Sequence, residues 1–140
     1  MNRTFLLGRR RLKQLTLPQH ELLRMHTAVW AMTRGTARHE EWDDLADLLA
    51  VVDALARMAK VDPMLVAPLI QDAIDGLAVA YKVPSGQMRV PGPAAHALHG
   101  IVTLYDACLS RDGQETIRDA IRLASVANDA ALHGVVVLQD

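Results

Sequence analysis

The sequence predicts an all-α fold, a bundle of four to five helices in one domain. Ala and Leu make up 41 of the 140 residues, a composition that favours helix over sheet. Apolar residues recur at spacings of three and four along each long segment. Capping residues, Pro and Gly separate these segments. Since Phe, Trp and Tyr together number only five, the core must be built from Leu, Ala, Val and Met.

The first helix is expected to begin near Pro18, with Thr16 as its N-cap and Gln19 at the capping-box position. Gly35 follows as a residue able to take the left-handed conformation that ends a helix. The apolar positions at helical spacing are Leu22, Met25, Val29 and Met32.

The second helix has the clearest pattern. Thr36 can cap it, and acidic residues crowd its first turns, where the helix dipole favours negative charge. Arg57 and Lys60 stand at its other end, where positive charge is favoured. Its predicted buried stripe is Trp42, Leu45, Leu49, Val52, Ala56 and Ala59.

Asp62-Pro63 marks the start of a third helix, and Pro68 lies five residues further on. A proline at that position removes a backbone hydrogen bond. Either residues 63–67 form a separate turn, or the helix is bent. Its predicted buried residues are Leu69, Ala73, Ile74, Leu77 and Tyr81.

Residues 83–93 hold three prolines and two glycines and are predicted to form a loop. A fourth helix is expected over 93–110, a turn over 111–113, and a fifth helix over 114–133, ending at Gly134. The inward residues of these two helices are Leu98, Ile101, Tyr105, Cys108, Ile117, Ile121 and Ala124.

The domain organisation follows from these boundaries: a basic N-terminal arm (1–15), a helical domain (16–134) and an apolar C-terminal tail (135–140). The tail either packs across the bundle or pairs with another chain as an edge strand. No uncharged run reaches the length of a membrane span, and no apolar region resembles a signal peptide. With a single cysteine, the chain is expected to be cytoplasmic.

The charge is strongly polarised although the total is only −1. Residues 1–38 hold eight Arg and Lys against one acid, residues 39–82 carry a net charge of −6, and the remainder −2. The arm residues Arg9, Arg10, Arg11 and Lys13 are therefore the predicted contact for an acidic partner or for nucleic acid. The alternative is a solvated tail, or one folded back on the acidic second helix.

No phosphate loop, dinucleotide fingerprint or nucleophile elbow is present, and no cofactor is expected. Cys108 is predicted to be a core residue. His96 and His99, three residues apart on one helix, are a candidate zinc pair, with surface histidines as the alternative. Trp30 and Trp42 are expected in the core with Met25, Met32 and Met58, rather than in a ligand pocket.

Glu40-Glu41-Trp42-Asp43-Asp44, followed by Asp72-Ala73-Ile74-Asp75, resembles the carboxylate pattern of the all-α nucleoside triphosphate pyrophosphohydrolases. The resemblance implies a magnesium site formed by Glu41, Asp44, Asp72 and Asp75. The chain departs from the family pattern by Asp in place of Glu at positions 44 and 72. Acids at a helix N-terminus also have a structural explanation.

The Arg-rich start, residues 15–26, the Arg34-Gly35 turn and Glu41-Trp42 opening a long helix together resemble short all-helical proteins carried by prophages and other mobile elements. That resemblance implies a protein that binds and blocks a host protein, or one that regulates transcription. The leading prediction is a non-enzymatic protein-interaction module. The alternatives are a nucleic-acid-binding regulator and a magnesium-dependent pyrophosphohydrolase. Because the Ala-rich helix faces are expected to leave part of the apolar surface exposed in the monomer, a homodimer is expected.

Overall fold

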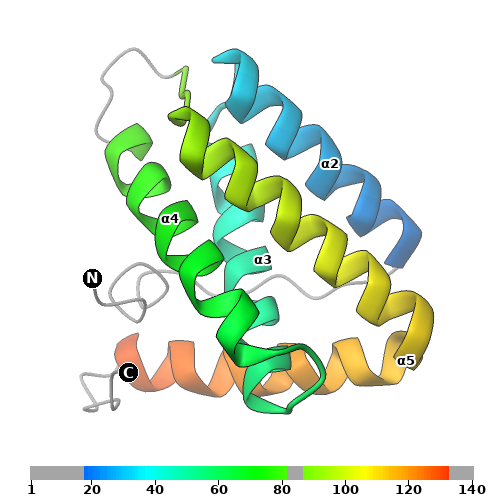
Figure 1. Ribbon diagram of the computed structural model, residues 1–140. Coiled ribbons are helices and arrows are strands. Elements are labelled where there is room, and N and C mark those ends of the chain that lie inside the picture. The colour runs from blue at the N-terminus through cyan, green and yellow to red at the C-terminus, as the bar shows by residue number, and fades with distance from the viewer. Residues whose placement is uncertain (1–17, 82–86, 133–140) are drawn as a thin grey trace.

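The computed structural model describes the backbone of residues 18–81 and 87–132, and the side chains of residues 22–81 and 87–126. The described chain forms four helices, α2 (Pro18–Arg34), α3 (His39–Arg57), α4 (Pro63–Tyr81) and α5 (Gly92–Leu132) (Figure 1). The predicted all-α bundle is confirmed. The predicted arm (1–15) and tail (135–140) lie outside the described residues.

Helix α2 has the predicted end and inward face, and its predicted N-cap, Thr16, lies outside the described residues. Met25, Val29 and Met32 are buried. Gly35 has a φ of 79°, the left-handed conformation that a residue with a Cβ adopts only at a cost, and it ends the helix as predicted.

Helix α3 begins two residues later than predicted, because its N-cap is Arg38 and not Thr36. The Thr36 backbone N–H and hydroxyl both donate to the carbonyl of Ala31, so this residue closes α2 and does not open α3. The N-cap is Arg38, in extended conformation, and its backbone N–H donates to the Glu41 carboxylate at 3.1 Å. That bond leaves Glu41 with a helix-capping role.

Helix α3 is the central element of the bundle. It packs against α2, α4 and α5, and every residue from 44 to 56 is buried. The predicted stripe is confirmed up to Ala56, but Ala59 lies beyond the helix, exposed and at a φ of 59°. The chain therefore reverses direction through Ala59, and Lys60 belongs to the turn.

Helix α4 is one helix from Pro63, with Pro68 inside it, so a separate turn at 63–67 does not form. Ala73, Ile74 and Leu77 are buried as predicted, whereas Tyr81 is 54% exposed. By length and composition α4 is the one helix of the described part that could cross a membrane. Here it packs along α3 and α5 as a helix of the bundle.

Helices α4 and α5 approach each other closely at Gly76. A Cβ placed on Gly76 would lie 2.2 Å from the Cβ of Ala94, well inside contact distance. The two backbones can therefore approach this closely only with glycine at position 76.

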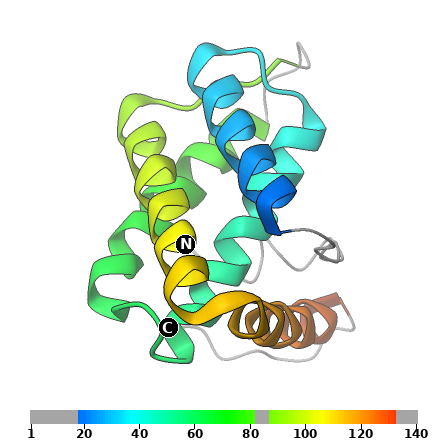
Figure 2. The ribbon, with the colours of Figure 1, turned by 90° about the vertical axis from the view of Figure 1, so that its right-hand side faces the viewer.

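Helix α5 contains the turn that the sequence predicts at 111–113. Gly113 has a φ of 83° and a ψ of −178°, and the chain changes direction there, so that the second half of α5 lies at the lower end of the bundle in both views (Figures 1 and 2). The Arg111 guanidinium donates to the carbonyl of Lys60 and thereby ties this turn to the α3–α4 connection.

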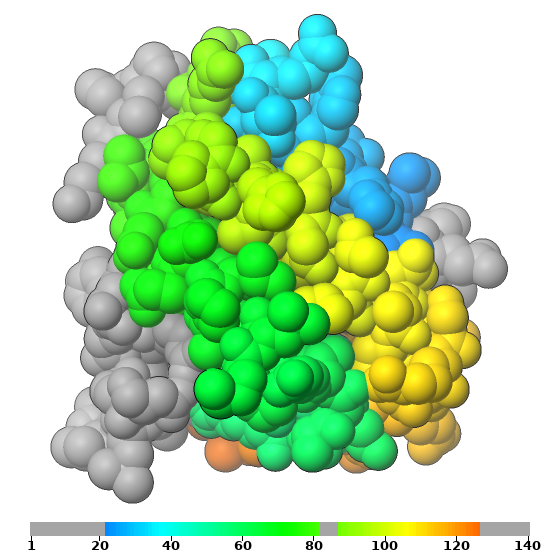
Figure 3. Space-filling model, viewed as in Figure 1, coloured from blue at the N-terminus to red at the C-terminus, as the bar shows by residue number. Residues whose placement is uncertain are grey.

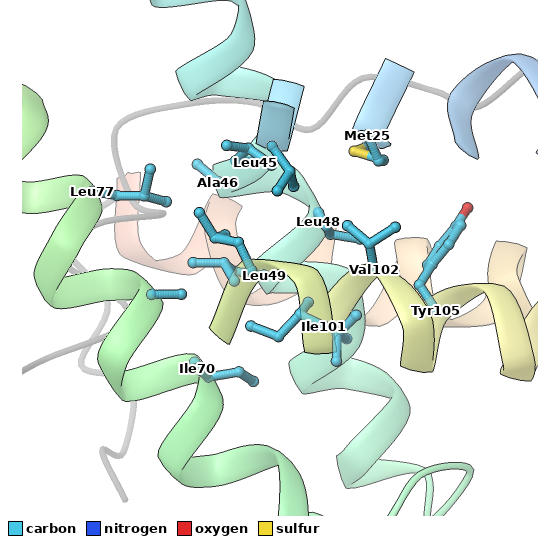
Figure 4. Packing of buried hydrophobic residues seen from close by; sticks show 14 of the residues in the cluster. Met25, Leu45, Ala46, Leu48, Leu49, Ile70, Leu77, Ile101, Val102 and Tyr105 are labelled. Carbon is cyan, nitrogen blue, oxygen red and sulfur yellow. The ribbon is translucent and has the colours of Figure 1, made fainter. Parts of the chain in front are cut away.

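The core lies where α3 packs against α2, α4 and α5. Leu45, Leu48 and Leu49 of α3 face Ile101 and Val102 of α5, with side chains of α4 and α2 closing the cluster (Figure 4). Fully burying such a side chain stabilises the fold by about 1.5–3 kcal/mol. The core contains no phenylalanine from the described residues, as the composition implies.

Candidate functional site: the arginine end

Three segments meet at the end of the bundle where α2 stops and α5 begins. The Met88 N–H donates to the Ala37 carbonyl at 2.7 Å, in an isolated antiparallel bridge. The Val90 N–H donates to the Met32 carbonyl at 3.2 Å. These bonds hold residues 87–90 against the connection between α2 and α3, so that side chains distant in sequence share one surface.

Three exposed arginines project from these segments: Arg34 at the end of α2, Arg38 before α3, and Arg89 before α5. The Arg89 aliphatic chain lies over Gly35, with its Cδ 3.5 Å from where a Cβ would stand. The Arg34 guanidinium lies 4.5 Å from the centre of the Trp30 ring. We call Trp30, Arg34, Arg38 and Arg89 the arginine end. The surface where α2 ends beside residues 88–90 is seen at the top of Figure 3.

The arginines of this group differ from those elsewhere in the described chain. Each of the following has an aspartate partner: Arg24 with Asp44 (2.5 Å), Arg57 with Asp53 (3.1 Å), Arg111 with Asp112 (2.7 Å) and Arg122 with Asp119 (2.9 Å). Arg118 bonds to the Gln114 amide oxygen. Within the described residues, Arg34, Arg38 and Arg89 have no carboxylate inside 4 Å. Their guanidinium donors are available to an external acceptor.

The nearest acidic residues in sequence are Glu40 and Glu41, in the first turn of α3. Glu41 accepts the backbone N–H of Arg38, so its carboxylate caps the helix. Glu40 is exposed. These two carboxylates limit the positive potential of the arginine end, which is therefore a local cluster of donors and not part of a broad basic face.

Trp30 is 57% exposed, and the expectation that it belongs to the core is wrong. It follows buried Val29 by one residue, which turns it away from the core and onto the outer face of α2 with Leu23, Thr27 and Arg34. The spacing of three and four from Leu23 to Arg34 was the signal in the sequence for this outer face. A guanidinium over an indole contributes about 0.5–1 kcal/mol at an exposed site.

An aromatic group adjoins the arginine end through His39, the residue after Arg38. The His39 and Tyr81 rings meet edge to face at 5.7 Å, and Tyr81 lies 4.8 Å from Trp42. Trp42 is buried and its indole N–H donates to the Leu77 carbonyl at 2.8 Å. Half-exposed Tyr81 is thus held in place by a buried neighbour.

The predicted partner-binding residues of the arm, Arg9, Arg10, Arg11 and Lys13, lie outside the described residues. None of Arg34, Arg38 and Arg89 was among the predicted site residues, and Arg89 stands in the Pro- and Gly-rich loop. Only the bridge between Ala37 and Met88 brings it to the other two arginines.

The four carboxylates of the pyrophosphohydrolase pattern have separate roles. Glu41 caps α3, and Asp44 is paired with Arg24 of α2. Asp72 and Asp75 are exposed on α4, where Asp75 accepts the amide N–H of Gln71. Among the described residues no group of three or more His, Cys, Asp or Glu side chains could hold a metal ion.

His96 and His99 are both exposed on α5. They lie on its outer face, and the described chain places no third ligand with them.

Cys108 is buried, as predicted, and its thiol donates to Asp112 at 3.5 Å. Burial and the neighbouring Asp112 carboxylate raise the pKa of the Cys108 thiol. Hydrogen bonding from Arg111 lowers the pKa of Asp112. A buried thiol with a raised pKa is a poor nucleophile, so this group is structural.

A groove of about 350 Å³ lies between the C-terminal half of α3 and the start of α4. Its lining is mostly apolar and includes the Asp53–Arg57 ion pair. The lining residues are Asp53, Ala56, Arg57, Pro63, Val66, Ala67 and Gln71. No nucleophile or general base stands in it, apart from the paired Asp53 carboxylate.

Comparison of the chain with known protein families, with curated proteins and with solved structures finds no match.

Proposed function

We propose that this protein is a non-enzymatic protein-interaction module that binds its partner through the arginine end. The observation that carries the proposal is Trp30, a large side chain left more than half exposed and held under the Arg34 guanidinium. Trp, Tyr and Arg are the residue types most enriched among side chains that dominate binding energy at protein interfaces. Trp30, Tyr81 and the three arginines supply all three types at this end.

The backbone of the arginine end is held in place by hydrogen bonds, which favours binding. Its segments are joined by backbone hydrogen bonds, and Trp30 stands on a regular helix. A surface that is ordered before binding loses less conformational entropy when a partner docks.

The resemblance to proteins of prophages and mobile elements supports a host protein as the partner and the cytoplasm as the compartment. We further propose a homodimer, on the grounds that α4 exposes Met64 (84%), Leu65 (54%) and Val79 (62%). Met64 and Leu65 are neighbours in the first turn of α4, and exposed large apolar residues of this kind mark interaction surfaces.

A capture experiment with a matched pair of variants tests the function. Tagged wild type, Trp30→Ser and Val126→Ser proteins are incubated with nuclease-treated host lysate, and bound proteins are identified by mass spectrometry. Val126→Ser removes a more exposed apolar side chain (68%) in the second half of α5, away from the arginine end and from the proposed dimer interface. We expect one protein in near-stoichiometric amount with wild type and Val126→Ser, and its loss with Trp30→Ser. The same proteins recovered with all three baits, or none with wild type, would contradict the proposal.

The second candidate function is a nucleic-acid-binding regulator. It is favoured by the same three arginines standing beside exposed Trp30 and Tyr81, since cations and aromatic rings together bind single strands. It predicts an affinity for oligonucleotides that falls steeply with salt and recovery from lysate that nuclease abolishes. An affinity that does not change between low and moderate salt would remove this candidate.

A further inference from the structure

We infer that the arginine end binds an acidic segment of its protein partner, in which carboxylates pair with Arg34, Arg38 and Arg89 and an apolar side chain packs at the edge of Trp30. This inference rests on the proposed function and names the chemistry of the partner.

The chain itself shows how its arginines are satisfied. Four of the remaining described arginines pair with aspartate, and a fifth bonds to a glutamine oxygen. The three that lack such a partner stand together at one end of the bundle. Guanidinium groups match the carboxylate in a planar, two-bond geometry, and such charge-assisted bonds are among the strongest in proteins.

The surroundings favour a carboxylate over a nucleic acid. A nucleic acid strand needs a basic track that follows several phosphates, whereas Glu40 and Glu41 follow Arg38 after one intervening residue, His39. One face of the Trp30 ring is covered by Arg34 at 4.5 Å, so a base that stacked on that face would have to displace a guanidinium. The exposed part of the ring remains accessible to an apolar side chain.

The arrangement also sets the shape of the partner segment. Arg34 and Trp30 lie one turn apart on α2, whereas Arg38 and Arg89 lie on the two segments joined by the bridge between Ala37 and Met88. A segment that alternates acidic and apolar residues can place carboxylates against the arginines and an apolar side chain against Trp30. We therefore use such a peptide as the probe.

The test measures fluorescence anisotropy with a labelled peptide of alternating Glu and Leu. The same peptide with Gln in place of Glu, and an oligothymidylate of equal charge, serve as comparison ligands. The proteins are wild type, the triple variant Arg34→Gln/Arg38→Gln/Arg89→Gln, and a control triple variant Lys60→Gln/Arg118→Gln/Arg122→Gln. Both variants remove three positive charges from exposed side chains. Circular dichroism verifies that both remain folded.

We expect the Glu peptide to bind wild type and the control triple variant with equal Kd. It should bind the arginine-end variant at least about tenfold more weakly, which corresponds to the loss of roughly one charge-assisted hydrogen bond. The Gln peptide should bind weakly to all three. Equal Kd values for the two triple variants, or tighter binding of the oligothymidylate than of the Glu peptide, would overturn the inference.

The lysate capture separates this inference from the proposed function. A partner that is lost with Trp30→Ser but retained by Arg34→Gln/Arg38→Gln/Arg89→Gln would refute the acidic segment and leave the interaction module standing. If wild type captures no partner, the proposed function itself fails, whatever the peptide does.

Discussion

At the scale of single residues, the two tryptophans have opposite roles although both were expected in the core. Trp42 is buried in α3, and its indole N–H bonds to the Leu77 carbonyl of α4. Trp30 is exposed on α2, with Arg34 over its ring. The apolar stripe of α2 already contained the information, because position 30 is out of phase with Met25, Val29 and Met32. The residue type alone predicted a core position for Trp30. Its position around the helix axis relative to the buried stripe places it on the exposed face.

The two tryptophans therefore respond differently to the same substitution. Trp42→Phe removes a buried donor and leaves a space, and we expect the free energy of unfolding to fall by about 1–3 kcal/mol. Trp30→Phe should change it by less than about 0.5 kcal/mol, because the site is exposed. Urea unfolding followed by circular dichroism measures both. Equal losses in the two variants would show that Trp42 is not the anchor between α3 and α4.

Cys108 gives a prediction about pH. The pKa of its thiol is raised in the folded protein by burial and by Asp112. As the pH rises past the ordinary pKa of a thiol, the unfolded chain therefore loses this proton before the folded protein does. The unfolded state then binds fewer protons than the folded state, and stability must fall as pH rises through this range. We expect urea unfolding of wild type to weaken above about pH 9 relative to Cys108→Ser, whose hydroxyl does not titrate. Parallel pH profiles of the two proteins would contradict the burial of the thiol.

At the scale of elements, the sequence predicted which segments form helices. It did not always predict the residues at which those helices begin. Pattern and capping residues predicted α2, α4 and both halves of α5, including the turn at Gly113. The start of α3 was placed too early, at Thr36. The backbone bridge from Ala37 to Met88, a contact between distant residues, keeps the chain extended until Arg38. Local sequence does not encode such a contact.

The crossing of α4 and α5 depends on a single missing side chain. Gly76→Ala places a Cβ 2.2 Å from that of Ala94, so the helices must separate. We expect a loss of about 1–3 kcal/mol in the free energy of unfolding, despite the better helix propensity of Ala. Gly92→Ala is the control, because nothing lies within 4 Å of its added Cβ. If Gly76→Ala proved as stable as the control in thermal unfolding, the close crossing would be wrong.

At the scale of the whole molecule, the sequence predicted polarised charge but not where the structure presents it. Arg34 and Arg38 belong to the basic first third, whereas Arg89 comes from a segment of net negative charge. Tertiary structure unites them, and pairing with aspartates neutralises four of the other described arginines. A site formed from distant segments in this way has no contiguous motif. This explains why the sequence predicted a contact at Arg9, Arg10, Arg11 and Lys13 and did not predict the arginine end.

The proposed homodimer is also a property of the whole molecule. Met64→Glu/Leu65→Glu introduces charge at the two exposed apolar residues that open α4. If α4 forms the interface, sedimentation velocity should show a dimer for wild type and a monomer for this variant, with unchanged helicity. A wild type that sediments as a monomer at every concentration would disprove the dimer, and a variant that remains dimeric would place the interface elsewhere.

The most direct test of binding through the arginine end is a hydrogen-exchange footprint of the protein with the partner captured from lysate. Amide exchange is measured by mass spectrometry for the protein alone and in the complex. We predict slower exchange at residues 30–39 and 87–90 in the complex, with residues 114–126 unchanged. Slower exchange confined to α4 or to the second half of α5, with the arginine end unaffected, would contradict binding at this surface.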